Sequence, residues 1–313
     1  MACMNFSKKI IFEFLIKVLK RNYILYLALF LFIFIFIDNK TEFNNAKLDT
    51  LNRSMLFDNK HLIKEVSSLT KEDKVQFQRS LDYYERIIEF MPNLPDANGM
   101  AGYCSYILGE NKKAIDYYKR AIELNPNFFY FYHNLGIIFF NEGSFEKAAW
   151  ALNKAIQTDP ALNMKFILSS PRIYMPIINQ DKADRNPAFQ LKEAYQENYK
   201  LLGLSYLKLK RYQDVVQIAS NSLKAGSSST SFYNYLLGVT AYELKEYDQA
   251  IGFLKNSIDN DPDNAEAFYY LGLILQQKGN TEQGNLFIKK SDSIKNTDNY
   301  SAAKENSFYL KHY

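Results

Sequence analysis

The residues that most often carry catalysis are sparse in this sequence. Its histidines are His61, His133 and His312, and its cysteines are Cys3 and Cys104. They form neither an HExxH pattern nor the clustered Cys/His spacing of a metal site. The sequence also lacks a GxxxxGK loop for phosphate and a GxSxG turn that would present a serine. We therefore expect no catalytic residue, no metal and no cofactor, and look for binding chemistry instead.

A repeat of about 34 residues must position whatever the protein uses for binding. Glycines recur at intervals of 34, 67, 35 and 34 residues, as Gly102, Gly136, Gly203, Gly238 and Gly272. With this glycine taken as the eighth residue, the units begin at Pro95, Phe129, Gln196, Ser231 and Ala265. Such a period is typical of stacked supersecondary units.

Other positions of the unit repeat as well. Position 20 is small and predicts a close helix crossing; it reads Ala114, Ala148, Val215, Ala250 and Gly284. Position 24 is mostly apolar and reads Tyr118, Leu152, Ala219, Leu254 and Ile288. Position 15 holds the turn glycines Gly109, Gly143 and Gly279, and position 32 the helix-ending prolines Pro126, Pro160 and Pro262.

These positions resemble the tetratricopeptide-repeat family over residues 95–162 and 196–298. The stretches NKKAIDYYKRAIELNP, which ends at Pro126, and FEKAAWALNKAIQTDP, which ends at Pro160, are close matches. The family's preferred Trp at position 4 is absent from every unit. The resemblance implies an all-α fold, a right-handed α-solenoid of about five to six helix–turn–helix units.

The remaining segments are assigned around the repeats. Residues 61–94 are expected to form a degenerate unit or a capping helix, with one longer helix near 71–90 that starts after Thr70. Residues 163–195 form an insert without the repeat signature that packs on the repeats, and a helix is expected from about Pro187 to Tyr206. Residues 95–162 hold two units, residues 196–298 hold three, and residues 299–313 form a tail or cap.

In this family, positions 2, 5, 9, 12 and 13 of the first helix line a concave groove, and we call these positions the first-helix face. The resemblance implies a partner-binding site with the following candidates: Tyr103, Tyr106, Tyr130, His133, Asn134, Phe140, Phe232, Tyr235, Tyr242 and Tyr269. Such rings suit a peptide ligand because they offer large contact area at small entropic cost. The alternative is that several rings pack against neighbouring helices.

One subtype of the family clamps the carboxylates of a chaperone tail with Lys, Asn and Arg side chains. Asn134 matches its single-Asn position. Gly99 and Tyr103, one unit earlier, do not supply the Lys and Asn that the clamp needs. We therefore do not expect this subtype.

The amino-terminal region predicts a membrane segment. Residues 22–37 (NYILYLALFLFIFIFI) carry no charge, follow the basic amphipathic stretch 1–21 and precede an asparagine-rich polar linker at 38–60. A retained single-pass transmembrane helix is favoured, with the basic flank in the cytoplasm and the repeats outside, in the periplasm if the organism is bacterial. A cleaved signal peptide is the alternative.

Charge is concentrated in the same region. Residues 1–21 hold five of the 38 basic and one of the 34 acidic residues, so the remainder carries 33 of each. A neutral repeat region argues against a general nucleic-acid binder. The sequence thus predicts a membrane-anchored interaction module or assembly factor that binds a protein or peptide. The alternatives are a secreted or periplasmic binding protein, or an enzyme with a site in the 163–195 insert.

Overall fold

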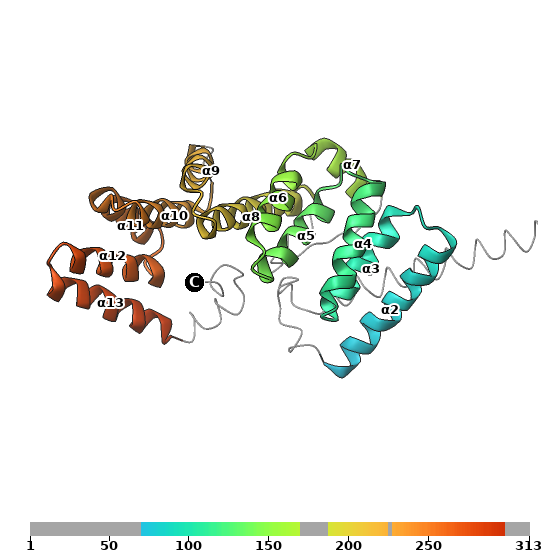
Figure 1. Cartoon of the computed structure of the whole chain (residues 1–313), viewed down its shortest axis with the longest axis horizontal. Coiled ribbons are helices and arrows are strands. Elements are labelled where there is room, and N and C mark those ends of the chain that lie inside the picture. Colours follow the sequence, from blue (N-terminus) through green and yellow to red (C-terminus); the bar gives the residue numbers. More distant parts are fainter. Residues whose placement is uncertain (1–69, 170–186, 225–226, 298–313) are drawn as a thin grey trace, which may run out of the picture. The chain divides into compact units, whose positions relative to one another are not determined.

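A computed structural model describes residues 70–169, 187–224 and 227–297, which form twelve α-helices and no strand (Figure 1). Their bounds are α2 Lys71–Phe90, α3 Pro95–Ile107, α4 Asn111–Leu124, α5 Phe129–Asn141, α6 Phe145–Ile156, α7 Pro160–Ser169, α8 Pro187–Lys208, α9 Tyr212–Lys224, α10 Thr230–Glu243, α11 Tyr247–Asn260, α12 Ala265–Gln277 and α13 Thr281–Lys295. The expected all-helical class is confirmed for these residues.

Each predicted unit is one helical hairpin. The pairs are α3–α4, α5–α6, α8–α9, α10–α11 and α12–α13, and within each pair the two helices pack against each other. Neighbouring units also touch, since α4 contacts α5, α6 contacts α8 and α11 contacts α12. The 34-residue repeat is therefore a stack of hairpins in which each unit buries the apolar surface of the next.

Small residues set the helix crossing inside a hairpin. A Cβ built on Gly136 would lie 2.7 Å from the Leu152 side chain, which is closer than real Cβ atoms approach, and a tight 3.3 Å from the Leu152 backbone nitrogen. Gly238 faces Leu254 at the same 2.7 Å. Positions 8 and 24 therefore meet, and a side chain at position 8 would force the two helices apart.

The turn inside each hairpin needs a left-handed residue. In α5–α6, Gly143 has φ +71°, its N–H bonds to the Phe140 carbonyl, and the Ser144 N–H bonds to the Phe139 carbonyl. This pair of bonds is the Schellman arrangement, which satisfies the last carbonyls of a helix. Lys210 (φ 56°) and Lys245 (φ 63°) occupy the equivalent position in the two units that lack the glycine.

The helix expected near 71–90 is confirmed as α2. Thr70 caps it, because the Thr70 hydroxyl accepts a hydrogen bond from the Asp73 N–H and the Asp73 carboxylate accepts one from the Thr70 N–H. This reciprocal pair is a capping box. Helix α2 buries Phe77, Leu81 and Tyr84 and packs on α3.

A helix that the sequence does not predict leads into the insert at residues 163–195. Helix α7 starts at Pro160, which fits the first turn because a proline there gives up no intrahelical hydrogen bond. The helix expected from Pro187 is confirmed as α8, whose later part is the first helix of the unit at Gln196 and packs on α6.

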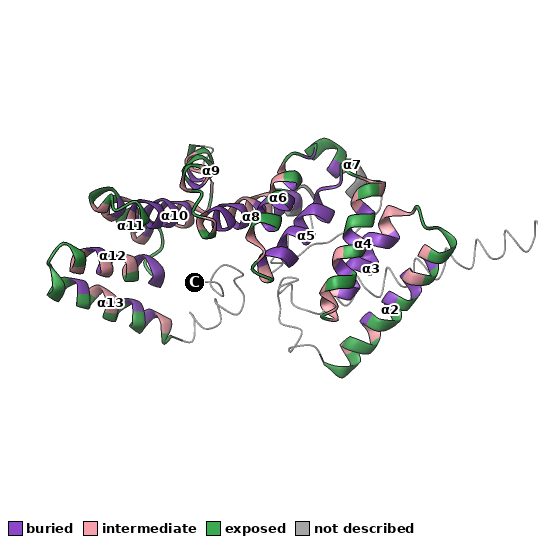
Figure 2. Ribbon diagram, in the orientation of Figure 1, coloured by how far each residue is buried: buried purple, intermediate pink, exposed green. Residues whose placement is uncertain are grey.

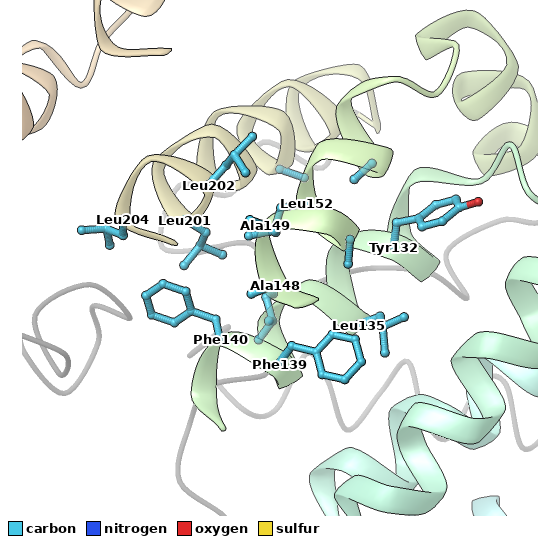
Figure 3. Packing of buried hydrophobic residues seen from close by; sticks show 14 of the residues in the cluster. Tyr132, Leu135, Phe139, Phe140, Ala148, Ala149, Leu152, Leu201, Leu202 and Leu204 are labelled. Atoms are coloured by element: carbon cyan, nitrogen blue, oxygen red, sulfur yellow. The ribbon is translucent and has the colours of Figure 1, made fainter. Parts of the chain in front are cut away.

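The core runs along the first helices. All residues from Phe129 to Phe140 on α5 are buried, so this helix is mostly purple in Figure 2. Leu201 and Leu202 of α8 lie beside Ala149 and Leu152 of α6 (Figure 3), within one cluster of buried side chains. The insert therefore leaves the stacking between the units at Phe129 and Gln196 intact.

Among the described helices, none is both long enough and apolar enough to span a bilayer. The membrane segment predicted at residues 22–37 lies outside the described residues, as do the linker 38–60 and the tail 299–313.

Candidate partner-binding face

The structure divides the ten candidate residues by exposure. Tyr269 is 39% exposed, and Tyr103, Tyr106, Phe232 and Tyr242 are half-buried. The others are buried, and they are Tyr130, His133, Asn134, Phe140 and Tyr235. Side chains without exposed area pack inside the stack rather than offering a surface, so the accessible candidates are reduced to the first group.

His133 shows what the buried group does. It is 0% exposed, and its Nδ1 lies 2.9 Å from the Asn198 Oδ1, so the ring nitrogen donates to the amide oxygen. Asn198, also buried, donates from Nδ2 to the Leu152 carbonyl over 2.7 Å. Phe129 stacks on the His133 ring with centroids 5.1 Å apart. His133 therefore joins α5 to α8, which is the packing alternative that the sequence left open.

Two amides of α5 tie this helix to the preceding unit. Asn134 donates to the Tyr118 hydroxyl over 3.0 Å, and Asn141 donates to the Tyr106 hydroxyl over 2.8 Å. Burial raises the pKa of Tyr106 to about 12, although the bond from Asn141 acts in the opposite direction. Tyr106 and Asn134 are thus engaged in contacts between units.

A second buried network, which the sequence does not reveal, surrounds Asn163 of α7. Its Oδ1 accepts from the Phe129 N–H over 2.7 Å, and its Nδ2 donates to the Thr158 hydroxyl and the Asp159 carbonyl, each over 2.9 Å. The Thr158 hydroxyl also lies 3.1 Å from the Tyr195 hydroxyl on α8. One asparagine therefore fastens α7 to the start of α5 and to α8.

Three of the five accessible candidates, Phe232, Tyr242 and Tyr269, lie on the last two units. Tyr270 of α12 lies edge-on to Tyr242 of α10, with ring centroids 5.3 Å apart, and to Tyr235 at 6.1 Å. Tyr269 adjoins Tyr270 at 5.8 Å. Tyr270 occupies position 6, outside the first-helix face, which is why position counting misses it. We call Tyr242, Tyr269 and Tyr270 the tyrosine cluster.

Lysines approach this face from both sides. The Lys295 Nζ of α13 lies 5.3 Å from the centre of the Tyr269 ring and 3.9 Å from the Glu266 Oε1. The Lys200 Nζ of α8 lies 5.8 Å from the Phe232 ring. Both are cation–π contacts, which ring electrostatics favour by about 0.5 to 1 kcal/mol at exposed sites. Tyrosine faces on this surface therefore attract ammonium groups.

An open pocket at the α8–α9 turn lies outside the first-helix face. Its lining is Lys210, Arg211, Tyr212, Gln213, Asp214, Val216, Gln217 and Leu244. Arg211 pairs with Asp214 at 2.8 Å and lies 4.5 Å from the Tyr206 ring. The principal cation of this pocket is thus already engaged by its own neighbours.

Comparisons with known proteins agree with the hairpins. The family model described as TPR repeat matches residues 102–143 and 238–279, and that of the tetratricopeptide repeat matches residues 129–162. A search of curated proteins finds no match.

Three solved structures align with this chain. A structure of pilF from Pseudomonas aeruginosa aligns with a TM-score of 0.50 at 12% identity, over 85% of this chain and all (100%) of that one. YrrB, described as a TPR protein with an unusual peptide-binding site, aligns at 0.46 and 15% identity over 72% and 98% of the two chains. MamA from Desulfovibrio magneticus RS-1 aligns at 0.48 and 15% identity over 65% and 96%. At such identities the pilF likeness supports the fold alone. With the family-model matches and the five hairpins, it shows that this chain contains tetratricopeptide repeats stacked as an all-helical solenoid.

Proposed function

We propose that the protein is an interaction module that binds a peptide or protein segment on the first-helix face of its last two units. The observation that carries the proposal is the tyrosine cluster, where exposed Tyr269 adjoins the half-buried Tyr270, which in turn contacts the half-buried Tyr242. Tyrosine is enriched at binding hot spots because a large ring has few rotamers to lose on binding. Phe232, half-buried in the first turn of α10, belongs to the same first-helix face as Tyr242.

The proposal assigns no catalytic residue and no cofactor. The proposal rests on the tetratricopeptide repeats of the chain. Stacked units of this kind supply a continuous surface rather than an enclosed site. The partner would lie along this surface, and its side chains would enter the spaces between the rings of the tyrosine cluster. Tyr103 and Tyr106, both half-buried, remain secondary candidates on the first unit.

We further propose that residues 22–37 anchor the protein in a membrane, with residues 38–60 as the spacer to the repeats. The uncharged run and the basic stretch before it support a single-pass helix with a cytoplasmic amino terminus and repeats on the other side. Mass spectrometry of the mature amino terminus and carbonate extraction test this. A protein that retains residues 1–37 and stays in the membrane pellet is anchored, whereas a shortened, released protein is a secreted module.

Crosslinking followed by pulldown from native membranes tests the binding proposal. The variant Tyr242→Ala with Tyr269→Ala removes two rings of the tyrosine cluster, and Trp150→Ala is the matched control. Trp150 is an aromatic residue that is 51% exposed on α6, away from the first-helix face. We expect the wild type and Trp150→Ala to recover the same partner and the double variant to lose most of it, with unchanged helicity by circular dichroism. Equal recovery by the double variant would remove the proposal.

A further inference from the structure

The last two units carry acidic residues beside their tyrosines. The first-helix face of these units consists of Phe232, Tyr235, Val239, Tyr242 and Glu243 on α10, and Glu266, Tyr269, Leu273, Gln276 and Gln277 on α12. It therefore contains two glutamates and no lysine or arginine. The preceding unit differs, because Lys200 and Lys208 outnumber Glu197 on its face.

Lys295 shows what this surface attracts. Its ammonium, on a side chain that is 36% exposed, lies 5.3 Å from the Tyr269 ring centre and 3.9 Å from the carboxylate of Glu266, whose side chain is 8% exposed. An aromatic face beside a carboxylate is the environment that a lysine or arginine side chain prefers at a binding surface, because ring and charge both attract the cation. The chain thus provides its own example of the contact at one end of the tyrosine cluster.

The other end has the same groups without an ammonium. Glu243 is exposed, and among the described residues it accepts one long hydrogen bond, from the Tyr212 hydroxyl at 3.5 Å, and joins no ion pair. It is close enough to Tyr242 and Tyr270 for its charge to add to burial in raising the pKa of both hydroxyls. Tyr242, Tyr270 and Glu243 therefore repeat the Tyr269–Glu266 arrangement.

We infer that the proposed partner is a peptide segment with a lysine or arginine side chain that lies against Tyr242 and Tyr270 beside Glu243. This inference rests on the proposed function and adds the charge of the partner to it. The cation gains a ring contact and an opposite charge, while an acidic side chain at the same place meets Glu243 and Glu266. The charge of this partner is opposite to that of the ligand of the carboxylate-clamping subtype, whose Lys and Asn are replaced here by Gly99 and Tyr103.

Selection from a random twelve-residue peptide library displayed on phage tests the inference. The purified full-length chain is the target, and the Tyr242→Ala/Tyr269→Ala variant is selected in parallel. We expect the wild type to enrich peptides that the double variant does not, with lysine or arginine above its frequency in the library. Enrichment without an excess of basic residues would overturn the inference and leave the proposed function standing. A wild type that enriches no more than the double variant would overturn both.

Fluorescence polarisation then measures the contribution of Glu243. The probe is the most enriched peptide, labelled with fluorescein, and its analogue with glutamine in place of the basic residue. We expect Glu243→Gln to lower the affinity for the parent peptide about two- to fivefold, which is the size of one exposed cation contact. The affinity for the analogue should hardly change. The effect of Glu243→Gln on the affinity for the parent peptide should shrink when the salt concentration rises from about 50 to about 500 mM, because salt screens the attraction between exposed charges.

Glu246→Gln is the matched control, because Glu246 is exposed at the α10–α11 turn and its side chain caps no helix. This control should bind both peptides as the wild type does. If Glu243→Gln also binds the two peptides as the wild type does, then Glu243 recognises no cation and the inference is wrong.

Discussion

Gly203 of α8 lies against Leu236 of α10, one unit further along the chain. A Cβ built on Gly203 would come within 2.8 Å of the Leu236 Cδ1, whereas Gly136 faces Leu152 of its own hairpin. The difference arises at position 24, which is Leu152 in the unit of Gly136 but the smaller Ala219 in that of Gly203. The missing side-chain volume inside one hairpin is therefore filled by a leucine of the next.

Alanine substitutions at three glycines should change stability in a graded order. Gly136→Ala meets both the side chain and the backbone of Leu152, so we expect it to lower the free energy of unfolding by about 1 to 3 kcal/mol. Gly203→Ala meets only the flexible end of Leu236 at close range and should cost less. Urea unfolding followed by circular dichroism measures both.

Gly252 on α11 provides the control, since a Cβ there has no neighbour within 4 Å. Gly252→Ala should raise stability by about 0.5 to 1 kcal/mol, because alanine is the better helix former. A loss of stability at Gly252, or none at Gly136, would contradict the crossing described here.

Most of the hairpin architecture follows from the sequence. Small residues at positions 8 and 20 recur because helices can cross closely only where side chains are absent or short, and this constraint leaves a visible period. Thr70 and Asp73 likewise predict the start of α2 by their spacing, since a capping box is a local arrangement. The five pairs from Pro95 to Lys295 therefore agree with the units counted from glycines.

The accessible part of the face does not follow from the sequence. His133 and Tyr235 fall at the same unit position as exposed Tyr269, yet they are buried, and Tyr130 and Phe140 are buried at other positions of the first-helix face. Their burial depends on which helix packs alongside, as with Asn198 on α8 beside His133, and such long-range partners leave no periodic signal. Helix α7 is missed for a similar reason, because Asn163 gains its role only through Phe129 and Tyr195.

The left-handed lysines should be sites of strain. Lys245, at φ 63°, occupies the turn position that glycine holds in the unit at Phe129, and a side chain in this conformation costs roughly 1 to 2 kcal/mol. Glycine also gives the unfolded chain more conformational entropy, which offsets part of this gain. Lys245→Gly should therefore stabilise the protein by about 0.5 to 1 kcal/mol. The thermal midpoint measures the gain.

Gly143→Ala is the converse substitution. Gly143 has φ +71° and no atom within 4 Å of a built Cβ, so the change tests backbone conformation without a clash. It should destabilise the protein by a similar amount, about 0.5 to 1 kcal/mol. If both substitutions lower the midpoint, the turns are not left-handed in solution.

Asn163→Ala should destabilise the junction between α5, α7 and α8. The substitution leaves the Phe129 N–H without its acceptor and the Thr158 hydroxyl without a donor, so we expect a loss of about 2 to 3 kcal/mol. Hydrogen exchange should accelerate at the Phe129 amide. Asn221→Ala, at an exposed site on α9, is the control and should change neither quantity.

Stability should fall at alkaline pH. Burial raises the pKa of Tyr106 and of Tyr233 to about 12, above the ordinary value of 10.0, because the charged tyrosinate is disfavoured inside the protein. A raised pKa in the folded state gives a contribution that is complete below pH 10 and is lost as pH rises toward 12. Unfolding at a series of pH values should show this decline, and Tyr233→Phe should make it less steep. An unchanged slope in that variant would mean that Tyr233 is not buried as described.

Photo-crosslinking at position 269 shows directly whether the partner binds to the first-helix face of the last two units. p-Benzoylphenylalanine replaces Tyr269 in one protein and Trp150 in another, two aromatic residues that are 39% and 51% exposed. If the first-helix face of the last units binds the partner, irradiation with the selected peptide should label the protein at position 269 and hardly at position 150. Equal labelling at the two positions, or labelling at position 150 alone, would contradict the assignment of the binding face.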